Sequence, residues 1–173
     1  RHDLGGAAKA YAEVLRLMPA ASNAQVKLAM VEMQRNALPT ATQLVEQAAR
    51  QQPGNLTAHL VLARALVARG DLDRAEAITQ SLLRGAPGLA VVQNQAGMLA
   101  LAKGDRVGAR AAFEKALAID NRMVEPLTML ATLDVQEKRP AEARARVDAR
   151  LRATPDASAV LALAGRTWAA TGD

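Results

Sequence analysis

Residues 90–123 read AVVQNQAGMLALAKGDRVGARAAFEKALAIDNRM and contain two amphipathic segments separated by a short break. Apolar residues recur in each segment at intervals of three and four, a periodicity that predicts an α-helix. Gly104 and Asp105 form the break. Glycine suits the left-handed position after a helix end, and aspartate can accept hydrogen bonds from the free N–H groups that open the next helix. The stretch therefore predicts two helices joined by a tight turn.

The same pattern returns along the whole chain at a spacing of 34 residues. One column of this repeat holds proline at Pro19, Pro53 and Pro87. A second column holds only alanine, at Ala7, Ala41, Ala75, Ala109 and Ala143. A third column holds only alanine or glycine, at Ala29, Ala63, Gly97, Ala131 and Gly165. Small residues let neighbouring helices approach to about 8–10 Å, so these columns predict where the helices cross.

The repeat predicts that residues 1–173 form a single array of helix pairs. Full repeats are expected at 22–55, 56–89, 90–123 and 124–157. The second helix of a truncated repeat is expected within 3–21, and the first helix of another within 158–173. Gly70 with Asp71 predicts a turn like the one at Gly104. Pro140 is expected in a first helical turn, where the missing N–H of proline is not needed.

The composition excludes several classes of protein and site. The chain has 173 residues, of which 50% are hydrophobic and 2% aromatic, enough for one domain with a core of small and aliphatic side chains. It has no cysteine, which excludes disulfides, thiolate zinc sites and thiol catalysis. No apolar run reaches the length of a membrane span, and no hydrophobic signal-peptide core follows the N-terminus. We therefore expect no membrane insertion of this segment.

No group of residues in the sequence predicts catalysis, cofactor binding or metal binding. His2 and His59 have no partners at ligand spacing. Residues 104–108 read GDRVG, but no strand precedes them and no Gly-Lys-Ser/Thr follows, so they are not a phosphate-binding loop. Glu32 and Asp134 are expected to be solvated or locally paired rather than to act in acid–base catalysis. We therefore predict that the chain is not an enzyme and needs no cofactor or metal.

The net charge of +5 does not predict a nucleic-acid partner. The 22 Lys and Arg residues are interspersed with 17 Asp and Glu residues. Arginines cluster on the last second helix, at Arg144, Arg146, Arg150 and Arg152. Their spacing does not form one stripe, acidic residues lie between them, and no aromatic residues are placed for base stacking. We expect a solvated outer face there rather than a phosphate-binding track.

The repeat resembles the tetratricopeptide repeat (TPR), a helix-turn-helix unit with a small residue in its first helix, an Ala-x-x-x-aromatic pair in its second and a terminal proline. Gly97 occupies the small site, and Ala109 with Phe113 forms the pair, which Ala7 and Tyr11 repeat. The family's tryptophan site holds Gln25, His59, Gln93 or Leu127 here, and its tyrosine site holds Glu32, Leu66, Ala100 or Asp134. The resemblance implies an all-α fold, a right-handed superhelical solenoid of antiparallel helix pairs with a concave inner face.

In this family, four positions of each first helix face the concave groove. Here they are Asn23, Val26, Met30, Met33, Thr57, Leu60, Arg64, Val67, Val91, Asn94, Met98, Leu101, Glu125, Thr128, Thr132 and Val135. The resemblance implies a protein-binding groove at these residues. Methionines suit adaptable apolar contacts, although methionine at helical spacing is as often core filler. The carboxylate clamp of some family members is absent, because Val26 and Met30 stand where it needs Lys and Asn.

These features predict a non-enzymatic scaffold that binds a peptide or protein segment in its groove. The composition is similar to that of long bacterial TPR arrays in exopolysaccharide synthesis and export, which favours the bacterial periplasm or envelope over the cytoplasm. Two alternatives stay open. The chain could be the regulatory region of an enzyme whose catalytic domain lies outside this segment, or it could be a rigid spacer between partners that bind elsewhere.

The chain begins and ends within a repeat, so we interpret it as part of a longer bacterial protein. Its ends are expected to expose apolar strips, with Leu4, Tyr11 and Leu15 at one and Leu161 and Trp168 at the other. Exposed apolar strips favour association, so we predict end-to-end self-association through the truncated repeats.

Overall fold

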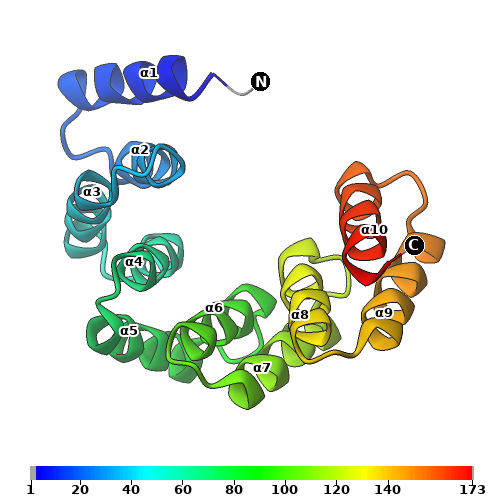
Figure 1. Ribbon diagram of the computed structural model, residues 1–173. Helices are drawn as coiled ribbons and strands as arrows, with labels where there is room; N and C mark the ends of the chain where they lie inside the picture. Colours follow the sequence, from blue (N-terminus) through cyan, green and yellow to red (C-terminus); the bar gives the residue numbers. More distant parts are fainter. Residues whose placement is uncertain (1–2, 173) are drawn as a thin grey trace. The chain divides into compact units, whose positions relative to one another are not determined.

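The chain folds into helices throughout the described region. The computed structural model describes residues 3–172, and this range holds ten helices and no strand (Figure 1). The helices are α1 (Leu4–Leu17), α2 (Ser22–Gln34), α3 (Leu38–Gln51), α4 (Leu56–Arg69), α5 (Leu72–Gly85), α6 (Ala90–Ala102), α7 (Arg106–Ile119), α8 (Val124–Gln136), α9 (Pro140–Ala153) and α10 (Ser158–Thr171). The predicted all-α fold is confirmed. Within the same range, no helix is long and apolar enough to cross a membrane.

Residues in the left-handed conformation follow four of the first helices. Gly70 and Gly104 follow α4 and α6 with φ angles of 78° and 81°, a region where glycine has no steric cost. Asn36 and Lys138 take the same conformation after α2 and α8, with φ angles of 62° and 57°. The turn between paired helices therefore keeps its geometry even where a Cβ makes it less favourable. Pro140 begins α9, as predicted.

The aspartates after these turns behave in two ways. Asp105 caps α7 as predicted, because its Oδ1 accepts a hydrogen bond of 2.8 Å from the Gly108 N–H. The prediction was wrong for Asp71, whose side chain accepts no backbone hydrogen bond at the start of α5. Asp71 instead pairs with the guanidinium of Arg74 at 3.3 Å. The nearby cation thus replaces the helix N-terminus as the partner of this carboxylate.

The chain divides after Pro87 into two compact units. The N-terminal unit contains α1 to α5, and the C-terminal unit contains α6 to α10. Consecutive helices pack against each other within each unit. The first helices α2 and α4 also pack together, as do α6 with α8 and α8 with α10. The exact division of the chain into repeats stays a prediction.

Small residues occupy the core of the N-terminal unit. Ala41 and Ala75 of the alanine column are fully buried, and so are Ala29 and Ala63 of the alanine-or-glycine column. Ala7 on α1 is half-buried. Four of these five positions therefore exclude water as the helix-crossing argument predicts, and the exception lies on the first helix of the unit.

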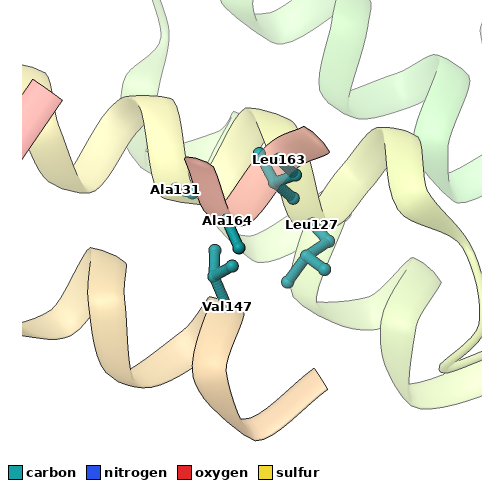
Figure 2. Packing of buried hydrophobic residues seen from close by; sticks show 5 residues of the cluster. All are labelled: Leu127, Ala131, Val147, Leu163 and Ala164. Atoms are coloured by element: carbon teal, nitrogen blue, oxygen red, sulfur yellow. The ribbon is translucent and has the colours of Figure 1, made fainter. Parts of the chain in front are cut away.

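Two clusters of buried residues stabilise the C-terminal unit. In the first cluster, Val147 of α9 packs with Leu127 and Ala131 of α8 and with Leu163 and Ala164 of α10 (Figure 2). Val147 and Ala164 are fully buried. One second helix thus fills the space beside two first helices, which is how successive repeats share a core.

The second cluster explains the glycine at position 97. Phe113 of α7 is fully buried and packs with Ala109, Leu130 and Leu133. A Cβ on Gly97 would lie 2.5 Å from Cε1 of Phe113, closer than side-chain atoms approach. The absence of a side chain on α6 therefore makes room for the aromatic ring of α7.

Candidate functional site

The predicted groove residues of the N-terminal unit lie on α2 and α4, which pack together. Seven of the eight are exposed or half-buried: Asn23, Met30, Met33, Thr57, Leu60, Arg64 and Val67. Val26 is buried and contributes to the packing of the unit instead. The accessible set is mainly apolar and includes two methionines, whose flexible side chains can adapt to different contacts.

The predicted residues of the C-terminal unit lie on α6 and α8. Val91 and Thr132 are exposed, whereas Met98, Leu101, Glu125, Thr128 and Val135 are half-buried. Asn94 is buried, and its Nδ2 donates a hydrogen bond of 2.7 Å to Oε2 of Glu125. This bond ties α6 to α8, so Asn94 holds two first helices together.

A hollow lies between α8 and α10 in the C-terminal unit. Its volume is about 360 Å³, and it is lined by Thr128, Ala131, Thr132, Val135, Gln136, Leu163, Arg166, Thr167 and Ala170. Three of these residues, Thr128, Thr132 and Val135, belong to the predicted groove. The structure therefore brings them to one concave surface with residues of the last helix.

The lining of this hollow combines apolar groups with a single cation. The hydroxyls of Thr128 and Thr132 donate 2.8 Å hydrogen bonds to the carbonyls of Val124 and Thr128 on their own helix. Arg166 is exposed, and its guanidinium has no hydrogen-bond or ion-pair partner within residues 3–172. The one charged group of the hollow is therefore available to an anion.

The sequence analysis missed the residues that α10 contributes to this hollow. Arg166 lies 34 residues after Thr132 and belongs to the same repeat column. The prediction covered only the full repeats and stopped before residue 158. Extending the column by one step would have found Arg166.

The two carboxylates in the family's tyrosine column have different surroundings. Glu32 is locally paired as predicted, with Oε1 at 2.7 Å from Nη1 of Arg35. Asp134 is fully buried, and the predicted solvation or purely local pairing was wrong there. Its Oδ1 lies 2.8 Å from Nη1 of Arg110 on α7, and its Oδ2 lies 3.1 Å from Nε of Arg146 on α9. Asp134 therefore joins three helices by charge.

The arginines of α9 are likewise not all solvated. Arg146 pairs with Asp134, and Arg144 donates from Nε to Oγ1 of Thr171 at 2.6 Å and from Nη2 to its carbonyl at 2.7 Å. The prediction of a solvated outer face was wrong for these two residues. Half of the predicted basic cluster is used in contacts between helices, which leaves no phosphate-binding track on α9.

The described residues offer no metal centre. Within residues 3–172, no group of three or more His, Cys, Asp and Glu side chains could hold a metal ion. His59 Nε2 lies 2.9 Å from the carbonyl oxygen of Pro53, at the start of its own helix. His2 lies outside the described residues. His59 therefore has a local structural partner.

A larger hollow, of about 500 Å³, lies beside His59 in the N-terminal unit. It is formed by the Pro53–Gly54 turn, by α4 and by the second half of α5, and its lining has no Asp, Glu, Lys or Arg. His59 stands where the family has tryptophan. The hollow offers shape without a charged group, so it carries no chemistry of its own.

Comparison with known proteins agrees with the fold. The sequence profile of the tetratricopeptide repeat matches residues 32–94 and 100–166, and a second tetratricopeptide repeat profile matches residues 1–55. No curated protein matches the chain.

Solved structures with the same fold come from several bacteria. TTC0263, a thermophilic TPR protein of Thermus thermophilus, is 24% identical with a TM-score of 0.86, over 96% of this chain and 90% of that chain. MamA of Desulfovibrio magneticus is 13% identical with a TM-score of 0.66, over 91% and 89% of the two chains. PilF of Pseudomonas aeruginosa is 19% identical with a TM-score of 0.67, over 86% and 68%. At these identities the likeness shows the fold alone.

Proposed function

The chain belongs to the tetratricopeptide repeat family, and we propose that it is a non-enzymatic scaffold that binds a segment of another protein on the first helices of its repeats. TPR folds generally mediate protein–protein interaction, and proteins built from them are typically not catalytic. The proposal names the surface: the predicted groove residues, extended by those of α10.

The hollow between α8 and α10 is the observation that supports this proposal. Its volume of about 360 Å³ is in the range of sites that enclose small groups, and it suits one or two side chains of a docked segment. Ala131, Val135 and Leu163 offer apolar contact. Because packed helices present this surface before any ligand arrives, little ordering entropy is lost on this side when a segment binds.

Arg166 favours a segment that carries a carboxylate. A guanidinium can hold a carboxylate through two parallel hydrogen bonds, which are stronger than those between neutral groups. Arg166 has no competing partner among residues 3–172. An acidic side chain or a terminal carboxylate next to an apolar side chain therefore matches the hollow.

Selected peptides test the proposed surface. Peptides of about 12 residues from a random display library are selected on the whole chain, and their affinities are measured by fluorescence anisotropy. Thr132→Arg narrows the hollow from an exposed position, and we expect it to weaken binding by at least about tenfold. Arg166→Gln should weaken acidic peptides more than neutral ones, because only the acidic peptides use its charge.

The matched control is Ala118→Arg. Ala118 is exposed on α7 and does not line the hollow, so the same side chain added there should leave the affinity unchanged. Selected peptides that bind the Thr132→Arg and Arg166→Gln variants as tightly as the unchanged chain would contradict the proposed surface. Failure to select any peptide that binds above background would contradict the scaffold function itself.

A role in exopolysaccharide synthesis or export, and a place in the bacterial periplasm or envelope, stay predictions that rest on composition. They concern the partner and the compartment of the scaffold. The binding surface is proposed independently of them.

A further inference from the structure

Second helices pack between two first helices. α3 packs against both α2 and α4, and α9 packs against both α8 and α10. By its repeat columns α1 is also a second helix, yet among the described helices it packs only against α2. α1 therefore lacks a first helix on its other side. Leu4, Tyr11 and Leu15 on α1 are half-buried rather than covered.

α10 has the converse property, because it is a first helix without a following second helix. In α8, Leu127 and Asp134 are 2% and 0% exposed, and α9 contacts both. The residues 34 positions later on α10, Leu161 and Trp168, are 49% and 37% exposed. Trp168 Nε1 donates a 3.1 Å hydrogen bond to Asp148 of the preceding α9. One side of α10 is thus packed and the other is open.

Residue sizes match across each helix pair. The small site of a first helix is followed 16 residues later by the aromatic site of its second helix, which gives the pairs Ala29–Val45, Ala63–Thr79, Gly97–Phe113 and Ala131–Val147. Glycine is thus paired with the aromatic ring, and alanine with β-branched residues. The other glycine of the small column is Gly165 on α10, and the other aromatic of the second column is Tyr11 on α1.

The open side of α10 has room for a ring. A Cβ on Gly165 would meet nothing within 4 Å, whereas one on Gly97 would meet the ring of Phe113 at 2.5 Å. Gly165 therefore has the same lack of a side chain as Gly97 but no aromatic over it. Tyr11 supplies an aromatic ring that lacks a glycine.

We propose that α10 of one copy of this chain binds α1 of a second copy, so that the two helices pack as α6 and α7 do. Tyr11 of one copy then lies over Gly165 of the other. Trp168 faces Ala10, since their columns hold Asp134 and Arg146, which lie 3.1 Å apart between α8 and α9. A large apolar side chain thus meets a small one.

This contact joins two different surfaces, so it does not close on itself by a two-fold axis. Copies add head to tail, and the product is a ring or an open chain. The inference goes beyond the proposed function, because neither α1 nor the open side of α10 belongs to the groove.

Sedimentation velocity of the whole chain tests the inference. We expect the average mass to rise with concentration over about 1–300 µM, beyond that of a dimer. Gly165→Leu fills the space that Tyr11 needs and should raise the concentration for half-association by at least about tenfold. Because leucine has a higher helix propensity than glycine, α10 should stay folded. Ala159→Leu is the matched control, since Ala159 is exposed on another face of α10.

Ala10→Arg blocks the other partner from an exposed position on α1, and Ala12→Arg is its matched control on an exposed site of the same helix. Gly165→Leu keeps an intact α1, and Ala10→Arg keeps an intact α10. Each variant alone should be monomeric. An equal mixture of the two should form one-to-one dimers and nothing larger, because each pair of blocked ends stops further growth.

Several results would overturn the inference. The unchanged chain could stay monomeric at every concentration, or the Gly165→Leu and Ala10→Arg variants could associate as their controls do. A mixture of these two variants that does not form dimers would exclude the head-to-tail geometry. Circular dichroism of each variant establishes that its helices are intact, so that a loss of association reports on the contact.

Discussion

The N-terminal and C-terminal units both place a carboxylate in the column where the family has tyrosine, and they stabilise it differently. Glu32 in the N-terminal unit pairs with Arg35, one turn along its own helix. Asp134 in the C-terminal unit pairs with arginines of the preceding and the following second helix, Arg110 and Arg146. A buried aromatic position can thus be replaced by a charge only where neighbouring helices supply cations. Otherwise the longer glutamate side chain pairs with an arginine at the surface.

The units differ in the same sense at their helix crossings. The N-terminal unit pairs alanine with β-branched residues, at Ala29 with Val45 and Ala63 with Thr79. The C-terminal unit includes the pair of Gly97 with the fully buried Phe113. One repeat geometry therefore accepts different side chains, provided that each exchange is compensated across the helix pair.

The largest expected effect separates the two carboxylates. Asp134→Ala leaves Arg110 and Arg146, whose side chains are 19% and 27% exposed, without the anion they share. We expect a loss of about 3 kcal/mol in the free energy of unfolding, since breaking a buried ion pair costs about 3–5 kcal/mol and these cations keep some access to water. Glu32→Ala should cost about 1 kcal/mol or less, because its partner Arg35 is exposed.

Urea denaturation of both variants measures this difference. Glu142→Ala, at an exposed acidic residue of α9, is the control and should change the free energy of unfolding by less than about 0.5 kcal/mol. Equal losses for Asp134→Ala and Glu32→Ala would mean that the two carboxylates are stabilised alike, and the comparison would fail.

This comparison also shows what sequence reasoning can reach. The 34-residue columns predict the helices and their turns because every repeat supplies the same local signal, and Gly97 with Phe113 is visible as a matched pair. The partners of Asp134 were missed because a column records what a residue replaces and says nothing of the charges opposite. Arg110 and Arg146 come from two other helices.

The candidate surface was predicted in part for the same reason. Positions that face a groove in a regular repeat can be closed by a neighbouring first helix, as at Asn94, whose amide bonds to Glu125. Val26 is buried where α2 and α4 pack together. The hollow beside α10 depends on a helix that the column analysis left out, so Arg166 was not found.

A smaller effect tests the matched helix crossings. Gly97→Ala places a Cβ 2.5 Å from the ring of Phe113 and should cost about 1–3 kcal/mol by overpacking. Gly165→Ala makes the same change in the same column where a Cβ meets nothing within 4 Å. It should therefore stabilise the chain by about 0.5–1 kcal/mol through helix propensity alone.

The double variant Gly97→Ala with Phe113→Val copies the alanine–valine pairs elsewhere in the chain. Its free energy of unfolding should exceed the sum of the two single changes by at least about 1 kcal/mol, because the smaller side chain gives back the space that alanine takes. Urea denaturation at a protein concentration where the chain is monomeric measures all four variants. Additive effects would show that the pair is not matched.

The smallest expected effect concerns two exposed carboxylates, one in each unit. The Arg16 side chain donates to Glu13 at 2.8 and 2.9 Å and lowers the pKa of Glu13. The pKa of Asp120 is lowered first by the backbone N–H of Arg122, at 3.0 Å, and then by the side chain of Arg122. The same direction of shift therefore has a side-chain cause in the N-terminal unit and mainly a backbone cause in the C-terminal unit.

Carboxyl-detected NMR titration of two variants distinguishes these causes. Arg16→Gln should return the pKa of Glu13 to its ordinary range, whereas Arg122→Gln should leave much of the lowering at Asp120, because the backbone donor remains. Each lowered pKa stabilises the fold above the pKa of the unfolded state, and this contribution disappears as the pH falls through the folded pKa. If Arg122→Gln removes the whole shift at Asp120, the side-chain charge rather than the backbone N–H is its main cause, and the two units do not differ here.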